Sequence, residues 1–169
     1  IGFCFVRFSP YRWARVTSFM RPEADPLGSG HQALQSLIAV GNGGLLGVGW
    51  GASMQKLNYL PEAHTDFIYA VISEEAGFIG ALVVLLLFVG ILWRGYHIAR
   101  RVRDGFLRLC AMGFTLLLTV QAFMNMSVVL SLAPNKGIPL PFISYGSSSL
   151  IASMASLGLL LSISKETGE

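Results

Sequence analysis

Acidic, imidazole and hydroxyl side chains are concentrated in residues 60–70, which read Leu-Pro-Glu-Ala-His-Thr-Asp-Phe-Ile-Tyr-Ala. The segment contains Glu62, His64 and Asp66, and an apolar stretch follows it directly. Carboxylates and imidazoles are the side chains that most often move protons in enzymes. A polar segment of this kind at the surface of a membrane is where we expect chemistry.

The composition indicates a membrane protein. Of the 169 residues 53% are hydrophobic and only 12% are charged, and the mean hydropathy is +0.61. These values lie far from the average of soluble proteins. The net charge of +3 needs no nucleic-acid partner, because most arginines lie in two connectors beside apolar segments. Cys4 and Cys110 both have apolar surroundings and suggest neither a disulfide framework nor a metal site.

Three uncharged runs are long enough to cross a bilayer. They cover residues 76–93, 109–135 and 137–164, with lengths of 18, 27 and 28 residues. A hydrocarbon core about 30 Å thick requires about 20 apolar residues in a helix. Because a backbone in lipid must satisfy its own hydrogen bonds, helices are the expected spanning form. The sequence therefore predicts an all-α, polytopic transmembrane helix bundle.

We divide the chain on this basis. We expect transmembrane helices at 76–93, 109–132 and 144–164, and the end of a truncated transmembrane helix at 1–8. Outside the membrane we expect a large loop at 9–75, with an interfacial or re-entrant Gly-rich segment, and a Pro-rich loop at 133–143. In the cytoplasm we expect a basic loop at 94–108 and a tail at 165–169. The chain thus reads as a fragment of a larger protein.

The basic connector sets the orientation. It contains five arginines and a single acid, Asp104, and by the positive-inside rule such a loop lies in the cytoplasm. Asp66 and the Pro-rich loop then lie outside.

The Gly-rich stretch leaves two interpretations open. Six glycines between Gly41 and Gly51 disfavour an uninterrupted spanning helix. Residues 31–40 have one apolar and one polar helical face, which is typical of a helix lying along a bilayer surface. Either the stretch nevertheless crosses the membrane, or the arginines before it are kept outside because they bind an anion. We favour the second. The glycine spacing lacks the strand and the Lys-Ser/Thr ending of a phosphate loop, so no nucleotide is expected.

Several ordered motifs resemble the SEDS family (shape, elongation, division and sporulation), most closely its FtsW branch and next its RodA branch. The resemblance extends over essentially the whole chain. It is carried by residues 25–30, 35–37, 55–57, 60–68, 74–80 and 136–146.

The resemblance implies a ten-helix membrane protein, of which this chain would be the carboxyl-terminal half. It implies a peptidoglycan glycosyltransferase that polymerises lipid II, a disaccharide-pentapeptide on undecaprenyl pyrophosphate, outside the bacterial cytoplasmic (inner) membrane. The implied partners are a class B penicillin-binding protein and other division proteins, and the implied place is the division septum. The essential Asp of the family matches Asp66.

Glycosyl transfer needs a base for the acceptor hydroxyl and positive charge for the departing pyrophosphate. Asp66 is the candidate catalytic base. Partial desolvation would raise its pKa, whereas a bound divalent cation, Mg or Mn, would favour the ionised form. Asp66 is therefore also the candidate metal ligand.

The candidate substrate-binding residues share the outer side of the predicted membrane. Cations for the pyrophosphate come first, because arginine and lysine bind phosphate oxygens, although each of them could equally extend to lipid headgroups. Glu62 could orient a lysine or simply be solvated, His64 could tune Asp66 or cap a helix, and the hydroxyls at the start of the last helix could reach the substrate or only cap it. The set is Arg15, Lys56, Glu62, His64, Lys136, Ser144 and Tyr145.

Two rival functions remain. A lipid II flippase would need a polar path, yet the predicted complete spans contain no charged residue. A non-enzymatic division scaffold would not depend on Asp66.

Overall fold

The computed structural model describes residues 29–51, 65–134 and 137–165. In this part of the chain the regular elements are all helices: α3 (Ser29–Gly43), α4 (Ile68–Glu75), α5 (Gly77–Arg101), α6 (Gly105–Val129) and α7 (Ser147–Lys165). The predicted all-α fold is confirmed. Three helices, α5, α6 and α7, are long and apolar enough to cross a membrane, as predicted.

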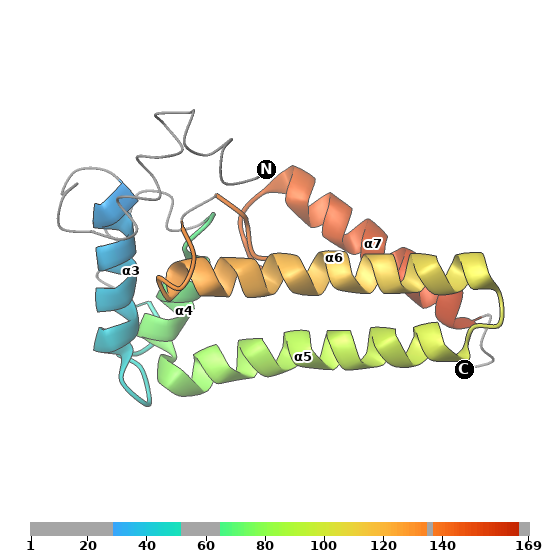
Figure 1. Ribbon diagram of the computed structural model, residues 1–169. Helices are drawn as coiled ribbons and strands as arrows, with labels where there is room; N and C mark the ends of the chain where they lie inside the picture. The colour runs from blue at the N-terminus through green and yellow to red at the C-terminus, as the bar shows by residue number, and fades with distance from the viewer. Residues whose placement is uncertain (1–28, 52–64, 135–136, 166–169) are drawn as a thin grey trace, which may run out of the picture.

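Helices α5 and α6 form an antiparallel hairpin that makes the long axis of the molecule (Figure 1). A three-residue turn joins them, and the Asp104 Oδ1 atom accepts hydrogen bonds from the backbone N–H groups of Phe106 and Leu107. This is the expected capping of a helix start by an acidic side chain. Gly95 packs directly against Thr115, which lets the two backbones approach closely.

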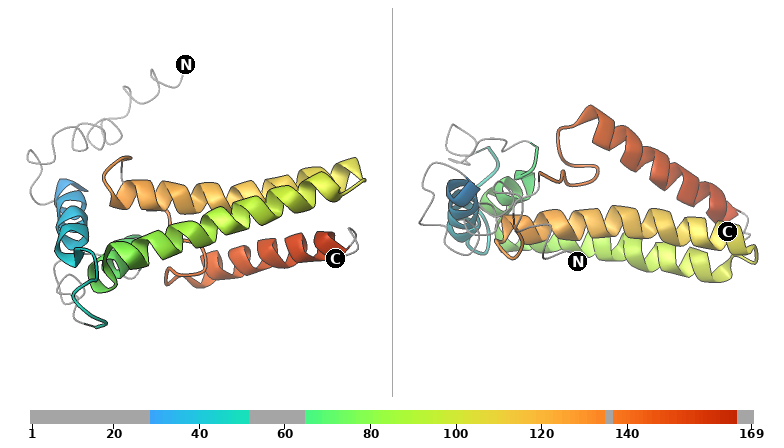
Figure 2. Two further views of the ribbon diagram at one scale, coloured as in Figure 1. Left: turned by 90° about the horizontal axis from the view of Figure 1, so that it is seen from below. Right: turned by 45° about the horizontal axis from the view of Figure 1, so that its top comes forward.

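Helix α7 packs against the same hairpin at the end that carries the α5–α6 turn (Figure 2). A buried apolar cluster joins the three helices there: Ile98, Ala99, Val102, Ala111, Leu160 and Ile163. The chain enters α7 through residues 137–146, which start beside the opposite end of α6.

Helix α3 lies across the far end of the hairpin, beside the short helix α4 (Figure 1). The contact is a seam of backbone against backbone. A Cβ atom at Gly43 would overlap the backbone of Ser73, and one at Gly47 would overlap the backbone of Glu75. The N–H groups of Val48 and Gly49 donate to the carbonyls of Glu74 and Glu75, at 3.0 and 3.1 Å. Glycine is needed here because no side chain fits between the two backbones.

The structure corrects two boundaries of the predicted division. The basic loop predicted at 94–108 is mostly helical, since α5 continues to Arg101 and α6 starts at Gly105. Arginine is a good helix former, so the loss of apolar character marks the edge of the hydrocarbon and not the end of the helix. Residues 68–75 of the predicted outer loop form α4, which a glycine with φ of +66°, Gly77, separates from α5.

The surface helix predicted for residues 31–40 is present within α3, but it packs through a different face. Ser36 and Ala39 are fully buried, whereas Leu34, Leu37 and Ile38 are exposed. Small residues allow the close approach to α4, and the larger apolar side chains remain on the outside of this contact.

Candidate functional site

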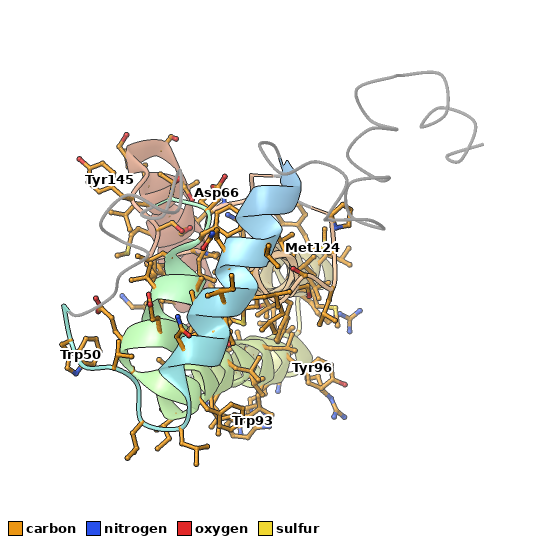
Figure 3. All side chains as sticks on the ribbon, turned by 90° about the vertical axis from the view of Figure 1, so that its left-hand side faces the viewer. Trp50, Asp66, Trp93, Tyr96, Met124 and Tyr145 are labelled. Carbon is orange, nitrogen blue, oxygen red and sulfur yellow. The ribbon has the colours of Figure 1, made fainter. Side chains whose placement is uncertain are left out.

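Asp66 lies two residues before α4, at the end of the molecule that α3 occupies. Its side chain is half-buried, whereas the neighbouring Phe67 is among the most buried side chains of the core. Figure 3 views this end and shows Asp66 and Tyr145 on the same side of α3. Burial of Phe67 fixes the chain immediately after Asp66, so the carboxylate is presented from an anchored backbone.

Asn125 of α6 holds the backbone of Asp66 directly. Its Nδ2 atom donates to the carbonyl of Asp66 at 2.7 Å and to the carbonyl of Ile138 at 2.7 Å. These partners are 59 and 13 residues away in the chain. A single buried amide therefore joins the segment that carries Asp66 to the Pro-rich loop.

Two further side chains strengthen this connection. Gln121, one turn before Asn125 on α6, donates from Nε2 to the carbonyl of Pro139 at 2.9 Å. The hydroxyl of Ser144 donates to the carbonyl of Thr65 at 2.5 Å and accepts from the N–H of Leu140 at 2.7 Å. Thus the backbones on both sides of the Asp66 side chain are bonded to α6 or to the loop 137–144.

The described segment 137–143 of the Pro-rich loop is itself firmly placed. Leu140 and Pro141 are almost fully buried, and Phe142 has a φ of +67°. A left-handed conformation is unfavourable for an aromatic residue and persists only where the surroundings impose it. Gly137, at the start of this loop, has a φ of +60°, and a Cβ atom there would lie 3.1 Å from Asp66 Oδ2. The loop backbone therefore borders the carboxylate closely.

The core below the site contains polar groups that are satisfied internally. Ser36 donates to the carbonyl of Val129 at 3.0 Å, which ties α3 to the end of α6. The Tyr69 hydroxyl donates to the carbonyl of Ala81 at 3.2 Å. Burial raises the pKa of Tyr69 above its usual value because the phenolate would be desolvated. Tyr69 is therefore protonated near neutral pH and is available as a hydrogen-bond donor.

In the described residues, two buried side-chain oxygens have no hydrogen-bond partner, and one of them is Asn125 Oδ1. The other is Oε1 of Glu75, in the last turn of α4. Glu74 and Glu75 are both buried, and their carbonyls accept hydrogen bonds from the N–H groups of Val48 and Gly49. Their burial indicates a structural role for both residues.

Three of the eight predicted site residues lie in the described part of the chain: Asp66, Ser144 and Tyr145. Ser144 is buried, and its hydroxyl already makes two hydrogen bonds, so it stabilises the backbone around the site. A substrate would have to displace one of these hydrogen bonds to reach it. Tyr145 is 83% exposed beside the start of α7. The other predicted residues lie outside the described residues: Arg15, Lys56, Glu62, His64 and Lys136.

Sequence reasoning missed the role of Gln121 and Asn125. Their spacing of one turn puts the two amides on one face of α6, and amides on membrane helices commonly hydrogen-bond to one another or across the bundle. The structure instead uses both amides to hold loop carbonyls. Carboxamides near the end of a spanning helix were the available signal, because a bundle end is where loop carbonyls need donors.

The arrangement combines a fixed backbone with a reachable carboxylate. Such a group can accept a proton from a bound hydroxyl or can bind a cation. In the described ranges there is no group of three or more His, Cys, Asp or Glu side chains that could hold a metal ion.

Comparison with known proteins gives consistent matches. The family model described as "Cell cycle protein", for FtsW, RodA and SpoVE, matches residues 2–169. A protein of Geobacter sp. (strain M18) named "Probable peptidoglycan glycosyltransferase FtsW" is 49% identical over 96% of this chain and 45% of its own length. "Stage V sporulation protein E" of Bacillus subtilis (strain 168) is 50% identical over 93% of this chain and 43% of its own length.

A solved structure is also similar. It is described by the words "Structural coordination of polymerization and crosslinking by a peptidoglycan synthase complex" and matches with a TM-score of 0.78 and 32% identity, over 95% of this chain and 44% of that one. The chain thus spans less than half the length of the proteins it matches. With a family match over nearly every residue and a shared helical architecture, the chain belongs to the FtsW/RodA/SpoVE family of cell cycle proteins.

Proposed function

We propose that the full-length protein is a peptidoglycan glycosyltransferase that polymerises lipid II, with Asp66 as the general base. The observation that carries the proposal is the way Asp66 is held. Asn125 and Ser144 fix the backbone on either side of it, while its side chain stays half-buried at the rim of the bundle. Relatives about 50% identical are named as glycosyltransferases of this kind.

The proposed reaction is a direct displacement. The 4-hydroxyl oxygen of the acceptor sugar attacks the anomeric carbon of the donor, the bond from that carbon to the pyrophosphate oxygen breaks, and Asp66 takes the hydroxyl proton. An α-linked donor then gives a β-linked product. Pyrophosphate is a good leaving group once its charge is balanced, so no second carboxylate is needed as a general acid. Arg15, Lys56 and Lys136 are the proposed sources of that charge.

A divalent cation, Mg²⁺ or Mn²⁺, fits this proposal as an ion held by one protein carboxylate and the substrate. Mg²⁺ is usually held by one or two carboxylates together with substrate phosphates, so a site with Asp66 as a single protein carboxylate is of the expected kind. When bound, the cation would neutralise pyrophosphate charge. This chain would supply the Asp66 carboxylate, which a fixed backbone holds in place.

We further propose that the protein works at the outer face of the bacterial cytoplasmic membrane with a class B penicillin-binding protein. The described spanning helices and the similarity to a structure described as a peptidoglycan synthase complex support this. The family description, "Cell cycle protein", favours cell division, and hence the septum, as the place of action.

The test is reconstituted polymerisation of lipid II by the full-length protein with its partner. Asp66→Asn keeps the size of the side chain but removes the base, and general-base catalysis contributes about 10²–10⁴-fold to a rate. We expect polymerisation to fall by about that factor, while folding and membrane insertion are unchanged. Robust glycan-strand formation by the variant would refute the proposal.

The chain offers a matched control at the opposite end of the bundle. Asp104→Asn also removes one carboxylate, and asparagine caps a helix about as well as aspartate. This variant should polymerise lipid II like the wild type. Equal losses in the two variants would mean that the effect of Asp66→Asn is not specific to the site.

A further inference from the structure

The end of the bundle opposite Asp66 presents a basic surface. Arg100 in the last turn of α5, Arg103 in the turn and Arg108 in the first turns of α6 are all exposed. The acid beside them, Asp104, directs Oδ1 to the backbone N–H groups of Phe106 and Leu107. Among the described residues, positive charge therefore dominates the surface at this end.

Aromatic side chains border the arginines on α5. Trp93, Tyr96 and Arg100 are spaced by three and four residues, so they share one helical face. The guanidinium of Arg100 lies over the Tyr96 ring, 5.7 Å from its centre, and the Trp93 ring stacks on His97 at 5.9 Å. Trp93 and Tyr96 nevertheless remain about two-thirds and half exposed, at 67% and 49%. They form an ordered aromatic stripe that has an open side.

The position of this stripe along α5 matches a membrane interface. At about 1.5 Å per residue, Trp93 lies about 24 Å and Arg100 about 35 Å from the start of the helix at Gly77. A hydrocarbon core about 30 Å thick would end between them. Tryptophan and tyrosine prefer that boundary, and arginines just beyond it reach the headgroup phosphates.

Helix α7 brings one more cation to the same end. Ile163 belongs to the buried cluster that joins α7 to Val102 and Ala111 beside the turn. Lys165, two residues later, ends α7 and is exposed. Cations from all three spanning helices or their connector therefore gather at one end, and the exposed apolar face of α5 continues from there with Leu86 and Val89, one heptad before Trp93 and Tyr96.

We propose that this end, formed by Trp93, Tyr96, Arg100, Arg103 and Arg108, is a binding site for an anionic phospholipid. The arginines bind the headgroup phosphate, the aromatic rings lie at the level of the glycerol, and the acyl chains follow the apolar face of α5. The occupant is a lipid because the cations adjoin a face that is itself apolar and exposed. A soluble anion would gain nothing from the aromatic stripe. This site is independent of the proposed glycosyl transfer.

The test is native mass spectrometry of the full-length protein in detergent, with phosphatidylglycerol or phosphatidylcholine of identical acyl chains. Each arginine near an anionic headgroup contributes roughly a fivefold gain in affinity. The Arg103→Gln/Arg108→Gln variant should therefore bind phosphatidylglycerol about 30-fold more weakly than the wild type. Phosphatidylcholine should bind the wild type more weakly than phosphatidylglycerol, and the difference between the two lipids should narrow in the variant, which keeps only Arg100 of the three arginines.

The charge-conserving variant Arg103→Lys/Arg108→Lys is the matched control and should keep phosphatidylglycerol affinity within about threefold, because lysine retains the charge. Unchanged affinity in the glutamine variant would overturn the proposal, as would equal affinity of the wild type for the two lipids. The second comparison needs no variant, so the proposal can be refuted even if a substitution harms folding. Displacement of phosphatidylglycerol by millimolar inorganic phosphate would also overturn it, because the site would then bind a free anion.

Discussion

Replacing Asn125 by leucine should separate the placement of Asp66 from its chemistry. The substitution keeps Asp66 itself and the approximate volume of the side chain. It removes both hydrogen bonds from Nδ2, to the carbonyls of Asp66 and Ile138. The segment before α4 and the Pro-rich loop then lose the amide that joins them.

The stability cost should be moderate. A buried carbonyl that loses its donor costs about 1–3 kcal/mol, and both bonds here are only partly buried, so about 1 kcal/mol each is appropriate. Asn125 Oδ1 is buried without a partner, and its removal returns part of that loss. We therefore expect a net loss of about 1–2 kcal/mol in the free energy of unfolding.

The activity cost should be larger than the stability cost. A displacement of a catalytic group by about 1 Å can lower a rate by about 10²-fold. We expect Asn125→Leu to reduce lipid II polymerisation by about that factor at temperatures where the protein is fully folded. The measurements are the polymerisation rate of the full-length protein with its partner and thermal unfolding of the same samples.

Ser127→Ala is a control on the same helix. The Ser127 hydroxyl donates to the carbonyl of Phe123, four residues earlier, and the substitution leaves the three amide bonds to the loops intact. This variant should match the wild type in both measurements. If Asn125→Leu polymerises lipid II at the rate of Ser127→Ala, then the amide does not position Asp66 and the reasoning fails.

Two other substitutions test the frame around the site. Ser144→Ala removes the hydroxyl that donates to the Thr65 carbonyl and accepts from the Leu140 N–H. Thermal unfolding should show a loss of about 1–3 kcal/mol, and polymerisation should fall. A variant as stable as the wild type would contradict this role. Gly47→Ala places a methyl group against the backbone of Glu75 at a φ of +82°, so the free energy of unfolding should fall by at least about 1–2 kcal/mol. Gly41→Ala is the control and should not destabilise the protein, because a Cβ atom there meets nothing within 4 Å.

The spanning helices were predictable because hydrocarbon imposes a simple rule on sequence. Long runs without charge predict spanning helices, and most of α5, α6 and α7 lies within those runs, although the last run also contains the loop 137–146. Their ends were less accurate, since Arg94 to Arg101 continue α5 beyond the uncharged run. Charge marks where water begins, whereas a helix ends where its hydrogen bonds and packing stop.

The candidate site was predictable only in part. Asp66 could be selected because its neighbours follow a known family pattern, and the structure places it at a bundle end beside the Pro-rich loop. The residues that hold it could not be selected. The contact between Asn125 and Asp66 joins positions 59 residues apart, and helical periodicity says nothing about partners at such a distance. The packed face of α3 was predicted wrongly for a related reason. The prediction relied on hydrophobic residues, whereas the close contact is made by the small residues Ser36, Ala39 and Gly43.

The seam between α3 and the α4–α5 junction has a mechanical consequence. Where side chains fill an interface, they can change rotamer and absorb a small shift between the two elements. At Gly43, Gly47 and Gly77 there is nothing to rearrange, because main chain touches main chain. This contact cannot adjust gradually, so a tilt of α3 would also move α4, the helix that starts two residues after Asp66.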